Sequence, residues 1–391
     1  MLATIYWKKF IELIEFLPVR IVVKNKPIEQ RYEHPKTLLL GVFAPGNKMG
    51  SAEYYFEEFL NLVKTADIPY DDTFFMKVRA TDNNMYFTKG KLEELSQKCQ
   101  ELGVDILVVS ELLHPLQERN LENVLNCRII DREQLILTIF KQSAHTSEGK
   151  IQIEMADIEF MKTRMSGRGR ELAQQSGIIG TRGPGETEKE ELKRVFADKL
   201  RQAQKKLETL ERARSVQRKQ RLESNQPLLC IIGYTNAGKS TLLNAIAKGN
   251  VLSEDKLFAT LDTTTRELFI DGKKKGLISD TVGFISQLPH HLISAFKSTL
   301  DELKYADLLL HVVDASCPAW ENQIAVVHEM LQELGVNKPM LYVFNKIDKL
   351  THEQREAQIA KLILYTPHVL VSALTKDGLT PLIDYLRTYQ L

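Results

Sequence analysis

The sequence of 391 residues is poor in cysteine and contains no long apolar run. Its four cysteines, at positions 99, 127, 230 and 317, form no Cys-x-x-Cys pair. This argues against a zinc site or a disulfide framework and favours a reducing compartment. No apolar stretch reaches the roughly 20 residues that a membrane-spanning helix needs. We therefore expect a cytoplasmic protein without a membrane span, and leave peripheral membrane attachment open.

The net charge is also small, because 52 basic residues nearly balance 51 acidic ones and leave a total of +1. Any binding to nucleic acid must then depend on local basic surface and not on a field around the whole molecule. The composition is otherwise that of an ordinary globular protein, with 43% hydrophobic and 26% charged residues. This length is ample for two domains with separate cores.

The first part of the chain alternates between short apolar strands and helical stretches. The pattern predicts strands at residues 37–43, 74–79, 105–110 and 128–131. Between and after them it predicts helices at 52–65, 91–102, 115–125 and 134–143. Such alternation is typical of a small parallel α/β domain, to which we assign residues 1–185.

Residues 164–185 at the end of this region are unusually rich in glycine and arginine. Glycine allows a backbone to approach a ligand closely, and arginine suits phosphate contacts. The candidates for RNA contact are Arg168, Arg170 and Arg182. On composition alone, a flexible linker explains the segment slightly better than an RNA-binding loop.

The next segment, residues 186–223, contains no glycine or proline. Apolar or small residues recur in steps of three and four, at Leu192, Phe196, Leu200, Ala203, Leu207, Leu210 and Ala213. This spacing predicts a helical arm over residues 186–224, long enough for a helical hairpin or a coiled coil. Its basic far end, residues 212–221, fits either a solvated face or a surface for RNA.

A phosphate-binding loop follows the apolar run at residues 228–232. Residues 233–241 read GYTNAGKST, with two glycines five positions apart and then Lys-Ser. Backbone amides and a helix N-terminus would hold the phosphates, Lys239 would bind the β and γ phosphates, and the Ser240 hydroxyl would bind Mg²⁺. The pattern alone could be a chance glycine turn.

Three further elements follow in the order that a guanine-nucleotide switch requires. A buried strand ends in Asp280, which can hold Mg²⁺ through a water molecule, and Gly283 follows, whose amide can contact the γ-phosphate. A second strand ends in Asn345-Lys346-Ile347-Asp348, where the carboxylate would recognise guanine. A third leads into Ser372-Ala373-Leu374, whose amides would meet the guanine carbonyl. Together these elements predict a GTPase domain of the Ras-like, doubly wound type over residues 227–391.

From roughly residue 37 to its end, the sequence resembles the HflX family of GTPases, which is related to the Obg group. The resemblance rests on GTRGPGETEKEELKRVF (residues 180–196), the phosphate loop, LFATLDTTTRE (257–267) and DTVGFISQLPHHLISAFKSTLDEL (280–303). NKID and several N-terminal segments, such as QERNLENVLNCRIIDREQLILTIF (117–140), extend it. One departure is Thr263, where the family usually has proline.

The resemblance implies GTP or GDP with Mg²⁺ as ligands and completes the predicted site. The switch threonine that joins Ser240 on the metal would be Thr260, with Thr264 as the second choice. Residues expected to act in hydrolysis are Lys239, Thr260 and Gly283. The nucleotide-binding set is Gly233, Tyr234, Thr235, Asn236, Ala237, Gly238, Lys239, Ser240, Thr241, Phe258, Ala259, Thr260, Leu261, Asp262, Asp280, Thr281, Val282, Gly283, Asn345, Lys346, Ile347, Asp348, Ser372, Ala373 and Leu374.

The resemblance also implies a partner. HflX-like proteins bind the ribosome, chiefly the large subunit and its RNA, and split stalled or idle ribosomes under stress. Phe284 follows Gly283, where many GTPases have a glutamine that orients the attacking water, so we expect slow hydrolysis that depends on this partner. We expect a monomer. Two alternatives are an RNA-remodelling NTPase that also uses ATP, and a regulator that recruits a protein partner.

Overall fold

The computed structural model describes residues 35–47, 50–165, 184–223, 226–247, 257–258, 264–289, 292 and 300–389. The chain divides into two compact units, one of residues 1–45 with 63–132 and one of residues 46–62 with 133–391. The glycine- and arginine-rich segment, with Arg168, Arg170 and Arg182, lies outside the described residues. The domain limits predicted above, at residues 185, 224 and 227, stay predictions.

The first unit is a small parallel α/β fold. Its strands are β1 (Thr37–Phe43), β2 (Asp72–Lys77), β3 (Ile106–Val109) and β4 (Arg128–Ile130), and they pair in the order β2-β1-β3-β4. All three pairings are parallel. Helices α3 (Lys89–Leu102) and α4 (Pro115–Leu125) connect successive strands, as parallel pairing requires. The predicted parallel α/β architecture is confirmed, although β2 begins two residues earlier than the pattern indicated.

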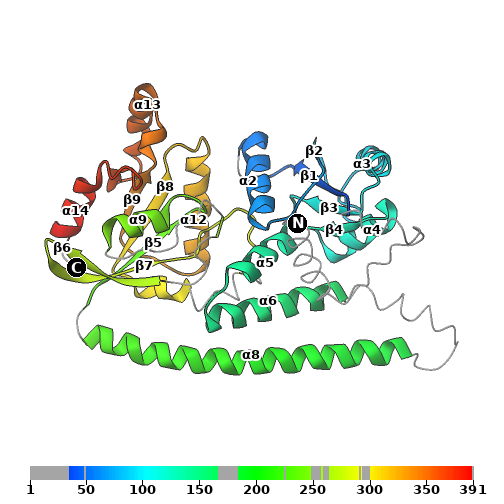
Figure 1. The fold of residues 1–391 in the computed structure, drawn as a ribbon, viewed down its shortest axis with the longest axis horizontal. Helices are drawn as coiled ribbons and strands as arrows, with labels where there is room; N and C mark the ends of the chain where they lie inside the picture. The colour runs from blue at the N-terminus through cyan, green and yellow to red at the C-terminus, as the bar shows by residue number, and fades with distance from the viewer. Residues whose placement is uncertain are drawn as a thin grey trace, which may run out of the picture. The chain divides into compact units, whose positions relative to one another are not determined.

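Among the described residues of the second unit, four helices precede its sheet. They are α2 (Ala52–Thr65) up to Leu62, α5 (Arg132–Ser143) from Glu133, α6 (Ser147–Met165) and α8 (Pro184–Glu223). The arm predicted from residue 186 is one continuous helix of 40 residues and not a hairpin folded on itself. Its partner is α6, which the sequence analysis did not predict as a helix and which runs alongside α8 (Figure 1).

Contact between α6 and α8 explains which part of the predicted apolar seam is used. Phe196, Ala203 and Leu207 of α8 are buried, whereas Leu192 and Ala213 at the two ends of the seam are exposed. On α6, the apolar residues Ile153, Ala156 and Phe160 are buried. The middle of the seam is therefore the buried face of a helix pair.

The remainder of the second unit is built around a six-stranded sheet. The strands are β5 (Leu228–Gly233), β6 (Thr264–Ile270), β7 (Lys273–Asp280), β8 (Leu308–Asp314), β9 (Met340–Asn345) and β10 (His368–Leu370). They pair in the order β10-β9-β8-β5-β7-β6, and only the β6–β7 pairing is antiparallel. The helices are α9 (Lys239–Ile246), α12 (Trp320–Glu333), α13 (His352–Leu362) and α14 (Leu379–Thr388). This arrangement confirms the predicted fold class.

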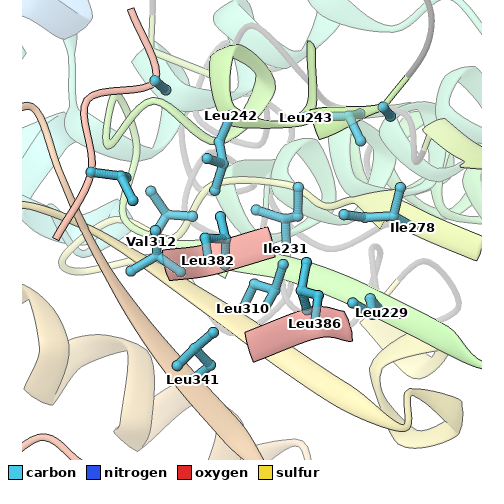
Figure 2. Close-up of a cluster of buried hydrophobic side chains, with 14 of the residues drawn as sticks. Leu229, Ile231, Leu242, Leu243, Ile278, Leu310, Val312, Leu341, Leu382 and Leu386 are labelled. Carbon is cyan, nitrogen blue, oxygen red and sulfur yellow. The ribbon is translucent and has the colours of Figure 1, made fainter. Parts of the chain in front are cut away.

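Apolar residues cover both faces of this sheet, as expected for parallel strands. On one face, Leu229, Ile231 and Leu310 pack against Leu242 of α9 and Leu382 of α14 (Figure 2). Helix α12 contacts β5 and β8. The carboxyl ends of the parallel strands meet at one edge, where doubly wound folds bind their ligands. Among the described residues, none of the helices has the length and apolar character needed to cross a bilayer.

Candidate functional site

The loop between β5 and α9 is shaped by two glycines that no other residue could replace without strain. Gly233 has a φ of +148°, and a Cβ there would lie 2.2 Å from the carbonyl oxygen of Val312 on β8. Gly238 has a φ of +91°, and a Cβ there would lie 2.3 Å from Nδ2 of Asn345. The glycine pattern therefore reflects two close approaches to neighbouring strands, which place the start of α9 at the carboxyl edge of the sheet.

Lys239, the first residue of α9, points back into this loop. Its side chain is buried, and Nζ donates a hydrogen bond to the carbonyl oxygen of Tyr234 at 2.8 Å. Burial lowers the pKa of Lys239 to about 8, although the nearby Asp280 carboxylate favours the charged form. A buried ammonium held in this way would gain strongly from an anionic ligand.

Ser240 and Asp280 are brought together from opposite sides of the loop. The Ser240 hydroxyl donates to Oδ2 of Asp280 at 2.6 Å, and Oδ1 of Asp280 accepts from the Thr281 amide at 3.0 Å. Thr281 is in turn anchored to β5, since its hydroxyl donates to the Ile231 carbonyl at 2.7 Å. A hydroxyl and a carboxylate are the oxygen ligands that Mg²⁺ prefers, so these residues fit the metal.

Asn345, at the end of β9, connects two loops of the site. Its Nδ2 donates to the Ala237 carbonyl at 2.9 Å, and its Oδ1 accepts from the Ala373 amide at 2.9 Å. The side chain is 2% exposed, so both bonds are made away from water. This asparagine links the phosphate loop to the Ser372-Ala373-Leu374 segment.

Lys346 and Asp348 lie on the outer side of the same loop. Lys346 adopts a φ of 64°, and its Nζ donates to the Asn236 carbonyl at 2.7 Å while pairing with Asp314 at 2.8 Å. Asp348 lies in the short 3-10 helix η3 (Ile347–Lys349) and is exposed, as is Leu374. The carboxylate predicted to recognise guanine is therefore accessible at the edge of the site.

The segment after β7 lies directly on the phosphate loop. The Thr235 amide donates to the Phe284 carbonyl at 2.7 Å, and the Phe284 amide donates to the Gly233 carbonyl at 3.1 Å. The Phe284 side chain is 2% exposed, so it serves as a core residue. Gly283 fits tightly, because a Cβ at this position would lie 2.9 Å from Lys239 Nζ.

The known proteins that this chain resembles include GTPases, in agreement with the geometry of the site. A GTPase HflX of Lacrimispora saccharolytica is 42% identical over 369 residues, which cover 94% of this chain and 84% of that protein. GTPase HflX of Escherichia coli is 39% identical over 332 residues, covering 84% and 78% respectively. The chain belongs to the HflX family of GTPases.

Three family models match successive parts of this HflX-family chain. "GTP-binding GTPase N-terminal" matches residues 53–141, "GTP-binding GTPase Middle Region" matches 143–221, and "50S ribosome-binding GTPase" matches 228–346. The predicted family is confirmed, and the protein is an enzyme that hydrolyses GTP. A crystal structure of a GTP-binding protein from Sulfolobus solfataricus in complex with GDP is also similar. It has 25% identity and a TM-score of 0.44, with 90% of this chain and 97% of that one covered.

Most of the predicted nucleotide-binding residues lie together at the carboxyl edge of the second unit's sheet. Ala259, Thr260, Leu261 and Asp262 lie outside the described residues, so the choice between Thr260 and Thr264 stays a prediction. Thr264 begins β6. Phe258 is buried, and its ring packs edge-to-face against Phe140 at 4.7 Å between centroids. The role of each of these residues toward nucleotide also stays a prediction.

Sequence reasoning missed a group of residues from α2 beside the phosphate loop. A cavity of about 350 Å³ is lined by Glu57, Glu58 and Asn61 of α2 together with Thr235 and Asn236. Asp314, the ion-pair partner of Lys346, also lines it. No local pattern marks Glu57 or Glu58, because both belong to an ordinary amphipathic helix that is far from the phosphate loop in the sequence.

Proposed function

We propose that this HflX-family GTPase is a GTP-dependent switch that binds the large ribosomal subunit and separates stalled or idle ribosomes into subunits under stress. The observation that carries the proposal is the match of residues 228–346 to a family described as ribosome-binding GTPases. In the same stretch, Lys239, Asp280 and Asn345 lie around one phosphate loop. We place the protein in the cytoplasm, acting as a monomer.

The proposed nucleotide site follows from these contacts. Amides of residues 236–241 and Lys239 hold the phosphates, and Asp348 selects guanine because adenine lacks the two donors that a carboxylate can accept. Ser240 and Asp280 hold Mg²⁺, together with a threonine that we assign to Thr260. The metal supplies charge neutralisation of the phosphates when it is bound. Support comes from the 2.6 Å contact between Ser240 and Asp280.

A partner is needed because Phe284 offers no group to orient water. The carbonyl and amide of Phe284 are both engaged by the phosphate loop, and its ring is buried. We propose that the ribosome rearranges this segment and supplies the missing group, so that hydrolysis is slow without it. Ribosomal RNA would be contacted by Arg168, Arg170 and Arg182 and by the basic end of α8.

The test is sedimentation of the protein with purified ribosomes, with a non-hydrolysable GTP analogue or with GDP. We expect co-migration with large subunits, and loss of the intact ribosome peak, with the analogue alone. A Lys239→Ala variant should show neither. Equal co-migration with both nucleotides would contradict a switch, and no co-migration at any salt concentration would direct the search to a protein partner. Binding through RNA phosphates should weaken steeply as salt is raised.

The alternative that includes ATP hydrolysis has a test of its own. The N-terminal part of the sequence contains no second phosphate-loop pattern. We therefore expect Lys239→Ala to abolish hydrolysis of every nucleoside triphosphate. ATP hydrolysis that survives this substitution would establish a second site.

A further inference from the structure

One face of α2 reaches the phosphate loop, the segment after β7 and the start of α12 within the second unit. The Tyr54 hydroxyl accepts a hydrogen bond from Nε2 of Gln323 at 2.5 Å. The Tyr55 hydroxyl donates to Oε1 of Gln287 at 3.1 Å. Glu58, one helical turn beyond Tyr54 and Tyr55, lies on the same face. Helix α2 therefore contacts the candidate nucleotide site through named polar groups.

Glu58 is the central member of this face. Its carboxylate is 5% exposed and accepts hydrogen bonds from the Tyr234 hydroxyl and, at 3.1 Å, from the Ser286 hydroxyl. The Tyr234 hydroxyl also accepts from the Ser286 amide at 2.8 Å. These three residues form a closed, buried ring of hydrogen bonds around an acidic side chain, which is stronger than a ring of neutral groups.

The ring joins two segments whose separation matters for nucleotide binding. Tyr234 is the second residue of the phosphate loop, and Ser286 follows Gly283 by three residues. Between them, the backbone of Phe284 pairs with the loop, and Gly283 lies against Lys239 Nζ. In the proposed nucleotide site, the γ-phosphate of GTP would lie beside Lys239 and Gly283, a position that GDP would leave empty.

We propose that Glu58 is a positioning residue for the GTPase reaction. Through Tyr234 and Ser286 it holds the segment after Gly283 against the phosphate loop, and so it lowers the affinity for GTP relative to GDP. A contact shifts an equilibrium between two states only if it differs between them. The ring is formed when the segment after Gly283 lies against the phosphate loop, as in this structure, and it would break if that segment moved away to admit a γ-phosphate. The inference rests on the nucleotide site proposed above but not on the ribosome as partner.

Glu57 provides a matched control on the same helix. It is exposed, lines the same cavity as Glu58 and has the same charge, but it has no part in the ring. If α2 opposed GTP merely by placing negative charge near a triphosphate, neutralising Glu57 would have the same effect as neutralising Glu58. If the ring is responsible, only Glu58 matters.

The experiment measures the Kd of the full-length protein for a fluorescent non-hydrolysable GTP analogue and for the matching GDP derivative. We expect Glu58→Gln to tighten the analogue about tenfold, the effect of losing one hydrogen bond to a buried charged group, and to change the Kd for GDP less than about twofold. Ser286→Ala should act in the same direction, and Glu57→Gln should change neither constant. In steady-state kinetics, Glu58→Gln should lower the KM for GTP more than it changes kcat.

Two results would overturn the proposal. Equal shifts for both nucleotides would mean that Glu58 only supports the fold, and an equal effect of Glu57→Gln would mean that unspecific charge is responsible. If Glu58→Gln lowers the melting temperature too far for titration, Ser286→Ala decides, because it removes a single hydroxyl from the ring. Unchanged binding of both nucleotides by Lys239→Ala would instead refute the proposed nucleotide site.

Discussion

Asn345 offers the sharpest test of how the site is held together, because one side chain joins two of its loops. Replacing it with alanine removes the bonds to the Ala237 carbonyl and the Ala373 amide, each 2.9 Å long. Ala237 and Ala373 are 1% and 4% exposed, so water does not readily replace the lost partner. Each orphaned buried group costs about 1–3 kcal/mol, which gives a loss of roughly 2–6 kcal/mol for Asn345→Ala.

The loss should be visible in both stability and nucleotide affinity. At about 2–4 °C per kcal/mol for a domain of this size, the melting temperature should fall by on the order of 10 °C in differential scanning calorimetry. GDP affinity should fall at least about tenfold, because the ligand must then order loops that are ordered in advance in the natural protein. Fluorescence titration with a labelled GDP measures this.

Asn345→Asp and Asn337→Ala complete the test. The aspartate keeps an acceptor for the Ala373 amide but turns an oxygen toward the Ala237 carbonyl, so it should destabilise at least as much as alanine. Asn337 is exposed between α12 and β9, and its replacement should change nothing. The reasoning is refuted if Asn345→Ala keeps its melting temperature within about 2 °C and its GDP affinity within about twofold.

Three further predictions concern Lys239, Gly233 and His311. Because the pKa of Lys239 is lowered from 10.5 to about 8, its ammonium group loses its proton as the pH rises through 8. Above that pH, the affinity for GDP should fall by up to about tenfold per pH unit. The Lys239→Ala variant should lack this pH dependence. Gly233→Ala, with a Cβ 2.2 Å from the Val312 carbonyl, should cost more than about 2 kcal/mol by chemical denaturation, whereas Gly90→Ala in open space on α3 should be neutral or slightly stabilising. Burial lowers the pKa of His311 from 6.5 to about 3, so on acidification this side chain takes up a proton in the unfolded chain before it does so in the folded protein. The free energy of unfolding should therefore drop by roughly 2 kcal/mol between pH 7 and pH 5. A His311→Leu variant that keeps the same acid sensitivity would contradict this.

The parts of the structure that the sequence predicted are those that local chemistry determines. Strand β1 and helices α2 and α4 begin and end where the pattern indicated, because hydrophobic periodicity and capping residues act within a few positions. Helix α4 shows this well: the His114 side chain and Gln117 form a capping box at its start. The phosphate loop was equally predictable, because its glycine spacing is a local sequence pattern and the close approaches at Gly233 and Gly238 require glycine.

The features that sequence reasoning missed depend on contacts between distant segments. Nothing around Glu58 distinguishes it from Glu57, yet only Glu58 meets a tyrosine 176 positions and a serine 228 positions further along the chain. Helix α6 was missed because residues 147–165 mix apolar and charged residues with no clear stripe, and its burial is decided by α8. Tertiary packing, and not propensity, selects such elements.

The unbroken length of α8 has a mechanical consequence. With 40 residues and a rise of 1.5 Å each, the helix is about 60 Å long. It ends at Glu223, and β5, which leads into the phosphate loop, begins at Leu228. A rotation of about 10° at that end would sweep the other end through roughly 10 Å by simple leverage on a rod of this length.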